Sequence, residues 1–279
     1  MSTSKTRITL EVCVDSVESA LNAVHGGADR IELCGNLGVG GGTTPSLGLL
    51  KCVRRAVNGV PIMAMIRPRT GDFLYSEDEM DVMLDDIRIF KRHGARGVVI
   101  GVLQRDGTVD VERTKRLVDE ALPMQGTFIL RPLLLTHPVE SGHAPAAPKA
   151  LPVLARLLQR TSGDTPWALS ILPGSGISPA TARELLEALV PLGLGELHMS
   201  GGSWEDGAME FRRPDMGMGA GSEWGVWRTQ AERVRAVRAI ADDFWDASRD
   251  EDDNNEEPTG AGPSDEGAGG QEDEQGGAV

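Results

Sequence analysis

The sequence lacks a long apolar run, since none of its 279 residues belongs to an uninterrupted apolar stretch of about 18 residues. This absence excludes a transmembrane helix. Residues 1–9 are polar and hold no apolar stretch ahead of a cleavage site, so we expect no signal peptide. These two observations predict a cytoplasmic protein with no membrane partner.

Cysteine and basic residues are also scarce. Three cysteines, an odd number in a long chain, do not make a disulfide framework, and we expect reduced thiols at Cys13, Cys34 and Cys52. Lysine and arginine number 28 against 42 acidic residues, for a formal net charge of −14. Without a basic surplus to neutralise phosphates, nucleic acid is excluded as the main partner.

The acidic excess is concentrated at the C-terminal end. Residues 250–279 contain no lysine or arginine and are rich in glycine and poor in apolar residues. Such a composition cannot bury enough apolar surface to offset chain ordering. We therefore predict a folded domain at 1–248 and a disordered acidic tail at 249–279.

Short apolar runs alternate with helical patterns over the first half of the chain, which predicts parallel strands joined by helices. About 250 residues is the usual size of a (β/α) barrel, and we predict an α/β fold of this TIM-like kind. The second half is less regular, with a long glycine- and methionine-containing loop at 204–227. Seven strands are predicted rather than eight, with about one βα unit lacking around 129–150. The predicted strands are 8–14, 29–34, 60–66, 96–102, 126–130, 167–172 and 195–200.

A repeated tripeptide stands in the first two predicted strands: Glu11-Val12-Cys13 and Glu32-Leu33-Cys34. Side chains alternate along a strand, so the glutamates and cysteines share one face and the apolar residues take the helix-covered face. In a barrel this places both thiols inside, near the C-terminal rim where active sites lie. Two such thiols suit Cu(I) or Zn²⁺. The alternative, that the cysteines are buried core residues, is the commoner case.

Three further features predict a site for a small anion. Arg67 ends the third predicted strand, and an arginine there can clamp a carboxylate or phosphate, or pair with Glu11 or Glu32 instead. Glycine-containing loops follow the last two predicted strands, as in barrel phosphate sites, although such loops also simply turn corners. His198 can be a ligand, an acid/base or a satisfied core histidine. The loop residues are Gly174, Ser175, Gly176, Ser200 and Gly201.

Long ordered stretches of the chain resemble the copper homeostasis protein CutC family. These are residues 10–37, 41–51, 65–87, 97–118 and 171–177, followed by the HMSGG segment that begins at His198. The resemblance implies a TIM-like barrel in the cytosol, a homo-oligomer and bound copper. Cys13 and Cys34 match cysteines proposed in the family as Cu(I) ligands, and Met65 or His198 is a candidate third ligand.

The chain departs from the family pattern after Phe128. A family His-Arg pair is absent, and Ile129-Leu130-Arg131-Pro132 stands in its place. A gapped barrel or a sequence joined across a wrong exon boundary would both produce this departure, and we favour the second. A transcript read uninterrupted across this segment would remove the exon explanation.

Three functions follow as hypotheses. The first is a cytosolic copper-binding protein with Cu(I) on Cys13 and Cys34. The second is a barrel enzyme acting on a small anionic or phosphorylated metabolite, although no reaction is established for the family. Its catalytic candidates are Glu11, Glu32, Arg67 and His198. The third is a binding or scaffold protein that uses the acidic tail and the loop at 204–227.

Overall fold

The computed structural model describes residues 7–128, 146–161, 170–219 and 222–255. The irregular segment at 129–145, where a βα unit was predicted to be lacking, lies outside these ranges. None of the helices in the described part is both long and apolar enough to cross a membrane.

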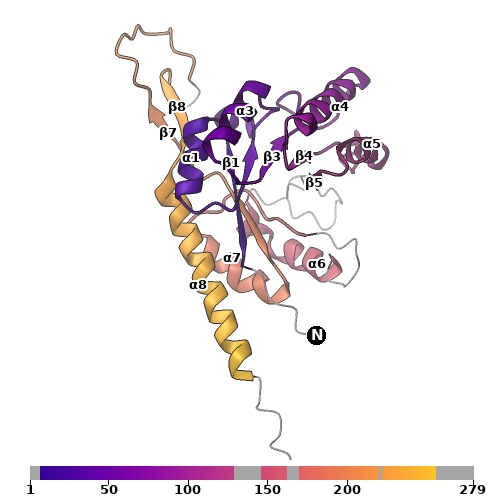
Figure 1. Ribbon diagram of the computed structural model, residues 1–279, viewed down its shortest axis with the longest axis vertical. Coiled ribbons are helices and arrows are strands. Elements are labelled where there is room, and N and C mark those ends of the chain that lie inside the picture. The colour runs from indigo at the N-terminus through magenta and orange to yellow at the C-terminus, as the bar shows by residue number, and fades with distance from the viewer. Residues whose placement is uncertain (1–6, 129–145, 162–169, 220–221, 256–279) are drawn as a thin grey trace, which may run out of the picture.

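Six parallel strands form one open, half-barrel sheet in the order β5-β4-β3-β2-β1-β6 (Figure 1). This confirms the predicted α/β class, and each strand lies within or next to a predicted range. Residues 167–169 of the remaining predicted strand are outside the described part, and 170–172 are not in a strand. The strands are β1 (Thr9–Val14), β2 (Arg30–Leu33), β3 (Ile62–Met65), β4 (Gly97–Ile100), β5 (Gln125–Phe128) and β6 (Glu196–Met199).

Helices join and cover the strands, as a parallel sheet requires. In Figure 1 they pack around the outside of the sheet, and α8 runs down one side from the β7–β8 hairpin. The helices are α1 (Val17–His25), α2 (Leu37–Gly40), α3 (Leu47–Ala56), α4 (Glu77–Arg92), α5 (Val111–Ala121), α6 (Leu151–Thr161), α7 (Ala182–Leu189) and α8 (Ala231–Asn255), with 3₁₀ turns η1 (Ala147–Ala150) and η2 (Val190–Leu192).

The two faces of the sheet carry different residues. Leu10, Val12 and Val14 belong to the main apolar core, together with Ile31 and Leu33 of β2. The opposite face carries the polar residues of β1 and β2, and beyond them a small separate cluster of Cys34, Met63, Met65 and Val99. The alternation predicted from the two tripeptides is therefore confirmed.

The prediction of a continuous loop over 204–227 is wrong at both ends. Strands β7 (Gly202–Asp206) and β8 (Gly225–Thr229) form an antiparallel hairpin there. Trp204 lies opposite Trp227, with ring centroids 5.5 Å apart in an edge-to-face arrangement. A cross-strand aromatic pair of this kind stabilises a hairpin despite the glycines around it.

The predicted boundary between domain and tail falls inside a helix. Helix α8 continues to Asn255, past residue 248. Residues 256–279 lie outside the described part, so the disordered tail stays a prediction.

Helix α4 begins with a capping box that the spacing of Ser76 and Glu79 predicts. Glu79 N donates to Ser76 Oγ over 3.2 Å, and Ser76 N donates to Glu79 Oε2 over 2.8 Å. Replacing Ser76 with alanine leaves an amide of the first turn without its acceptor. We expect Ser76→Ala to lower the free energy of unfolding by about 1 kcal/mol in urea titrations. Ser76→Thr keeps the acceptor and should stay close to the parent; equal losses in both variants would contradict the role of the cap.

Candidate metal centre

Polar side chains of three neighbouring strands meet on the inner face of the sheet. The strand register places Glu11 of β1 between Arg30 of β2 and His198 of β6, and it places Cys13 opposite Glu32. Because parallel neighbours in register share a face, these five side chains lie on one side of the sheet. The sequence assigned four of them to a site, and the structure brings those four together.

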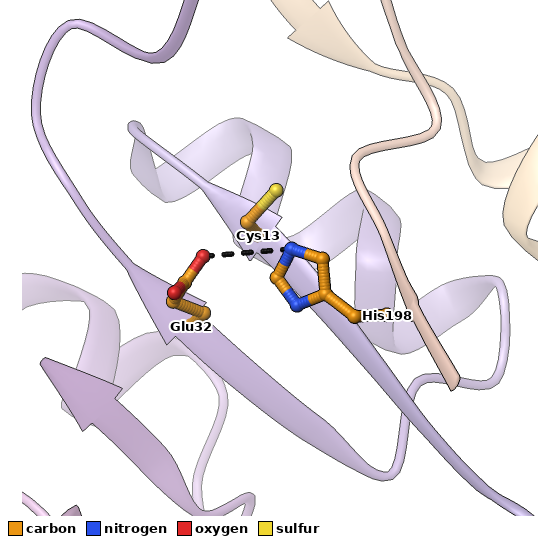
Figure 2. A group of neighbouring side chains, drawn as sticks. All are labelled: Cys13, Glu32 and His198. Carbon is orange, nitrogen blue, oxygen red and sulfur yellow. Dashed lines mark ion pairs between the residues drawn. The ribbon is translucent and has the colours of Figure 1, made fainter. Parts of the chain in front are cut away.

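Cys13, Glu32 and His198 form a compact group that could hold a metal ion (Figure 2). One ligand atom from each lies within 4.8 Å of the others. Cys13 is 6% exposed and Glu32 is also buried, so bulk water has little access to the group. Thiol, carboxylate and imidazole are three of the donor types that hold zinc, and the thiol and imidazole also suit copper.

Both ring nitrogens of His198 face carboxylates. Nδ1 lies 2.7 Å from Glu11 Oε1, and Nε2 lies 3.6 Å from Glu32 Oε2. Burial by itself lowers the pKa of His198, but the interactions with Cys13 and Glu32 and the hydrogen bond with Glu11 reverse the shift, so the pKa ends well above its usual value. The imidazole is therefore held in its protonated form between two carboxyl groups.

Burial also acts on the two groups beside His198. It raises the pKa of the Cys13 thiol, and the nearby imidazole offsets only part of that rise. Burial would raise the pKa of Glu11 too, but His198 and Arg30 more than cancel it, and the pKa is lowered. The resting site thus carries a protonated thiol beside a charged Glu11–His198 pair.

Arg30 and Glu196 complete this charge network, and neither was predicted. Arg30 Nε lies 2.5 Å from Glu11 Oε2, and its Nη2 lies 2.5 Å from Glu196 Oε2. Strand alternation could have identified Arg30 from the sequence, because Arg30 precedes Glu32 by two positions and so shares its inward face. Arg30 fixes the carboxylate that in turn orients His198.

Cys34 lies apart from this group, in an apolar setting. Its side chain is fully buried, packs with Met63, Met65 and Val99, and its Sγ donates to Val14 O over 3.5 Å. Burial raises the pKa of the Cys34 thiol well above its usual value, and nearby negative groups add to the rise. Both predicted ligand thiols are free of disulfides, on the inner face and at the C-terminal ends of adjacent strands.

Arg67 is 5% exposed and its guanidinium faces backbone carbonyls. Nη1 donates to the oxygens of Gly40 and Gly42, and Nη2 donates to the oxygen of Gly71. Its partners in the described residues are therefore loop carbonyls and the Phe73 ring, not the predicted carboxylates of Glu11 or Glu32. An arginine that donates to three loop carbonyls holds those loops together. Anion binding by Arg67 stays a prediction.

One of the two predicted anion loops borders His198. A Cβ at Gly174 would lie 3.1 Å from His198 Cδ2, and His198 N donates to Pro173 O over 2.9 Å. In that loop Ser175 adopts φ 69° and Gly176 φ 72°. The second loop, Ser200 and Gly201, turns toward α8, where Gln230 N donates to Gly201 O. Only the first of the two loops adjoins the polar group.

Known proteins are similar to this chain in sequence along most of its length. The profile described as "CutC family" matches residues 8–131. A human protein named copper homeostasis protein cutC homolog is 42% identical over 250 residues, which cover 83% of this chain and 88% of the human protein. A CutC family protein of Chromobacterium violaceum is 40% identical over 250 residues, covering 84% and 98%.

A solved structure agrees on the fold. The crystal structure of the putative copper homeostasis protein CutC from Streptococcus agalactiae superposes with a TM-score of 0.55 at 22% identity, covering 69% of this chain and 98% of that one. This likeness concerns the fold alone, while the identity to the human and bacterial relatives extends over 83% and 84% of this chain. The chain belongs to the CutC family, the family of the copper homeostasis proteins that it matches.

Proposed function

We propose that this protein binds Cu(I) on the inner face of the half-barrel, with the thiolates of Cys13 and Cys34 as ligands. The observation that carries the proposal is the placement of two buried, unpaired thiols at the C-terminal ends of β1 and β2. Thiolate is a soft ligand that selects Cu(I). We infer that the metal is copper from the relatives that are named copper homeostasis proteins.

The surroundings of the two thiols fit a monovalent soft cation. On one side, Glu11 and Glu32 supply negative charge close to Cys13. On the other side, the methionines that pack on Cys34 keep water and hard oxygen ligands away. Two thiols, one of them packed among methionines, favour a soft metal over the hydrated cations Mg²⁺ and Ca²⁺.

Competition titrations against a Cu(I) chelator, with reduced protein, test this proposal. We expect Cys13→Ser and Cys34→Ser each to weaken Cu(I) binding by at least about 100-fold, since each removes a ligand rather than a supporting group. Cys52→Ser is the matched control, because Cys52 is exposed on α3 and should bind as the parent does. A double Cys13→Ser, Cys34→Ser variant that bound Cu(I) as well as the parent would overturn the proposal.

A second candidate function has one observation in its favour. Glu11 orients His198 through a 2.7 Å hydrogen bond, and Cys13 lies beside the ring, which is the arrangement of a nucleophile, a base and a group that orients the base. An enzyme acting on a small anionic metabolite would use His198 as its acid or base. Thermal-shift screening with phosphorylated metabolites tests this candidate, and stabilisation retained by both His198→Asn and Arg67→Ala would count against it.

A further inference from the structure

Gly42 lies directly against Cys34 and close to Met65. A Cβ added to Gly42 would lie 3.0 Å from Cys34 Sγ and 3.8 Å from Met65 Cε. Gly42 has φ +90°, a backbone conformation that residues other than glycine rarely adopt. The thiol and the methyl end of the thioether side chain therefore both lie next to Gly42, where a larger residue would not fit.

The glycine segment that contains Gly42 is fixed. Arg67 Nη1 donates to Gly40 O and to Gly42 O, each over 2.7 Å. The guanidinium also lies 4.9 Å from the centroid of the Phe73 ring. Because the arginine is buried and bonded to both carbonyls, the distance between Gly42 and the two sulfur-containing side chains is set by the fold.

His198 is less suited than Met65 to be a further ligand of a metal on Cys34. Each of its ring nitrogens already faces a carboxylate, at 2.7 Å from Glu11 and 3.6 Å from Glu32. A metal would have to displace one of these contacts. Met65 is 3% exposed and packs against Cys34 itself. Its thioether carries no proton and needs no hydrogen-bond partner, so a soft metal can approach it without breaking a contact.

We infer that Met65 is the neutral thioether ligand of Cu(I) beside Cys34, at the place where the glycine segment held by Arg67 packs directly on both side chains. This inference rests on the proposed copper function and adds a third ligand to it. Sulfur-only coordination on the Cys34 side suits Cu(I) and disfavours Zn²⁺, which also accepts nitrogen and oxygen ligands.

Met63 provides the matched control, since it is a buried methionine on the same strand and face. Its Sδ and Cε lie over Gly97 of β4, where an added Cβ would be 2.7 Å and 2.3 Å away. We expect Met65→Leu to weaken Cu(I) binding roughly 10-fold with an unchanged unfolding midpoint. Met63→Leu, a replacement of the same size, should leave Cu(I) binding unchanged.

Selenium gives a direct readout of the same ligand. In selenomethionine-substituted protein loaded with Cu(I), selenium-edge X-ray absorption should show a copper neighbour. That neighbour should be lost in Met65→Leu and kept in Met63→Leu. Binding by Met65→Leu equal to the parent, with no copper next to selenium, would overturn the role of Met65, while loss of binding in the cysteine variants would still support the proposed function. Binding unaffected in the double cysteine variant would overturn both.

Discussion

Cu(I) affinity should fall by about four orders of magnitude when the pH is lowered from about 8 to about 6. A cysteine binds metal as the thiolate, so each thiol ligand releases a proton on binding wherever its pKa lies above the pH. Burial raises the pKa of both Cys13 and Cys34 above the ordinary thiol value. Both thiols are therefore protonated across this range, and each costs about one order of magnitude per pH unit. Chelator competition at several pH values measures the slope.

The slope also counts the thiol ligands. Removing one of them with Cys34→Ser should halve the pH dependence, in addition to weakening the binding at every pH. Thioether ligands bind no proton, so Met65→Leu should shift the affinity curve without changing its slope. An affinity that stays flat between pH 8 and 6 in the parent protein would mean that the thiolates are not the ligands.

The residues of the site could be predicted from the sequence because strand alternation is a local property. Glu11, Cys13 and Glu32 follow from counting by two along two short apolar runs, and the structure places all three on the inner face. What the sequence does not contain is the alignment of one strand against the next. The register puts Cys13 opposite Glu32. Cys34 lies two residues beyond Glu32 on the same face and packs beside Met65. Two equivalent tripeptides thus acquire different surroundings.

The contacts that the sequence did not reveal join residues that are not neighbours in the chain. For Arg67 the sequence left open an anion clamp and a pair with Glu11 or Glu32. In the structure its Nη1 and Nη2 donate to carbonyls of the glycine segment before it and of the turn after it. Trp204 and Trp227 form a hairpin across more than twenty intervening residues, and glycine-rich composition between them conceals it. In both cases the chain position of a residue carries no information about the group that it touches.

Loss of Arg30 should destabilise the domain by about 3 kcal/mol, because the buried Glu11 would lose one of its two cationic partners. Glu11 is 1% exposed. Arg30 forms one ion pair with Glu11 and a second with the half-buried Glu196. In Arg30→Gln two carboxylates would face an amide, and only His198 would remain to neutralise Glu11. Urea unfolding of the metal-free, reduced protein at neutral pH measures the loss.

The pH dependence separates this electrostatic effect from lost packing. The pKa of Glu11 is lowered in the folded protein, so its ionic contribution is present above the unfolded value of 4.5 and is lost as the pH falls through the folded value. The difference between parent and Arg30→Gln should therefore shrink toward pH 4, where the variant protonates Glu11. Adding Glu11→Gln to Arg30→Gln removes the buried charge and should recover part of the stability. A constant difference at every pH, with no recovery in the double variant, would show that Arg30 stabilises the sheet by packing rather than by its charge.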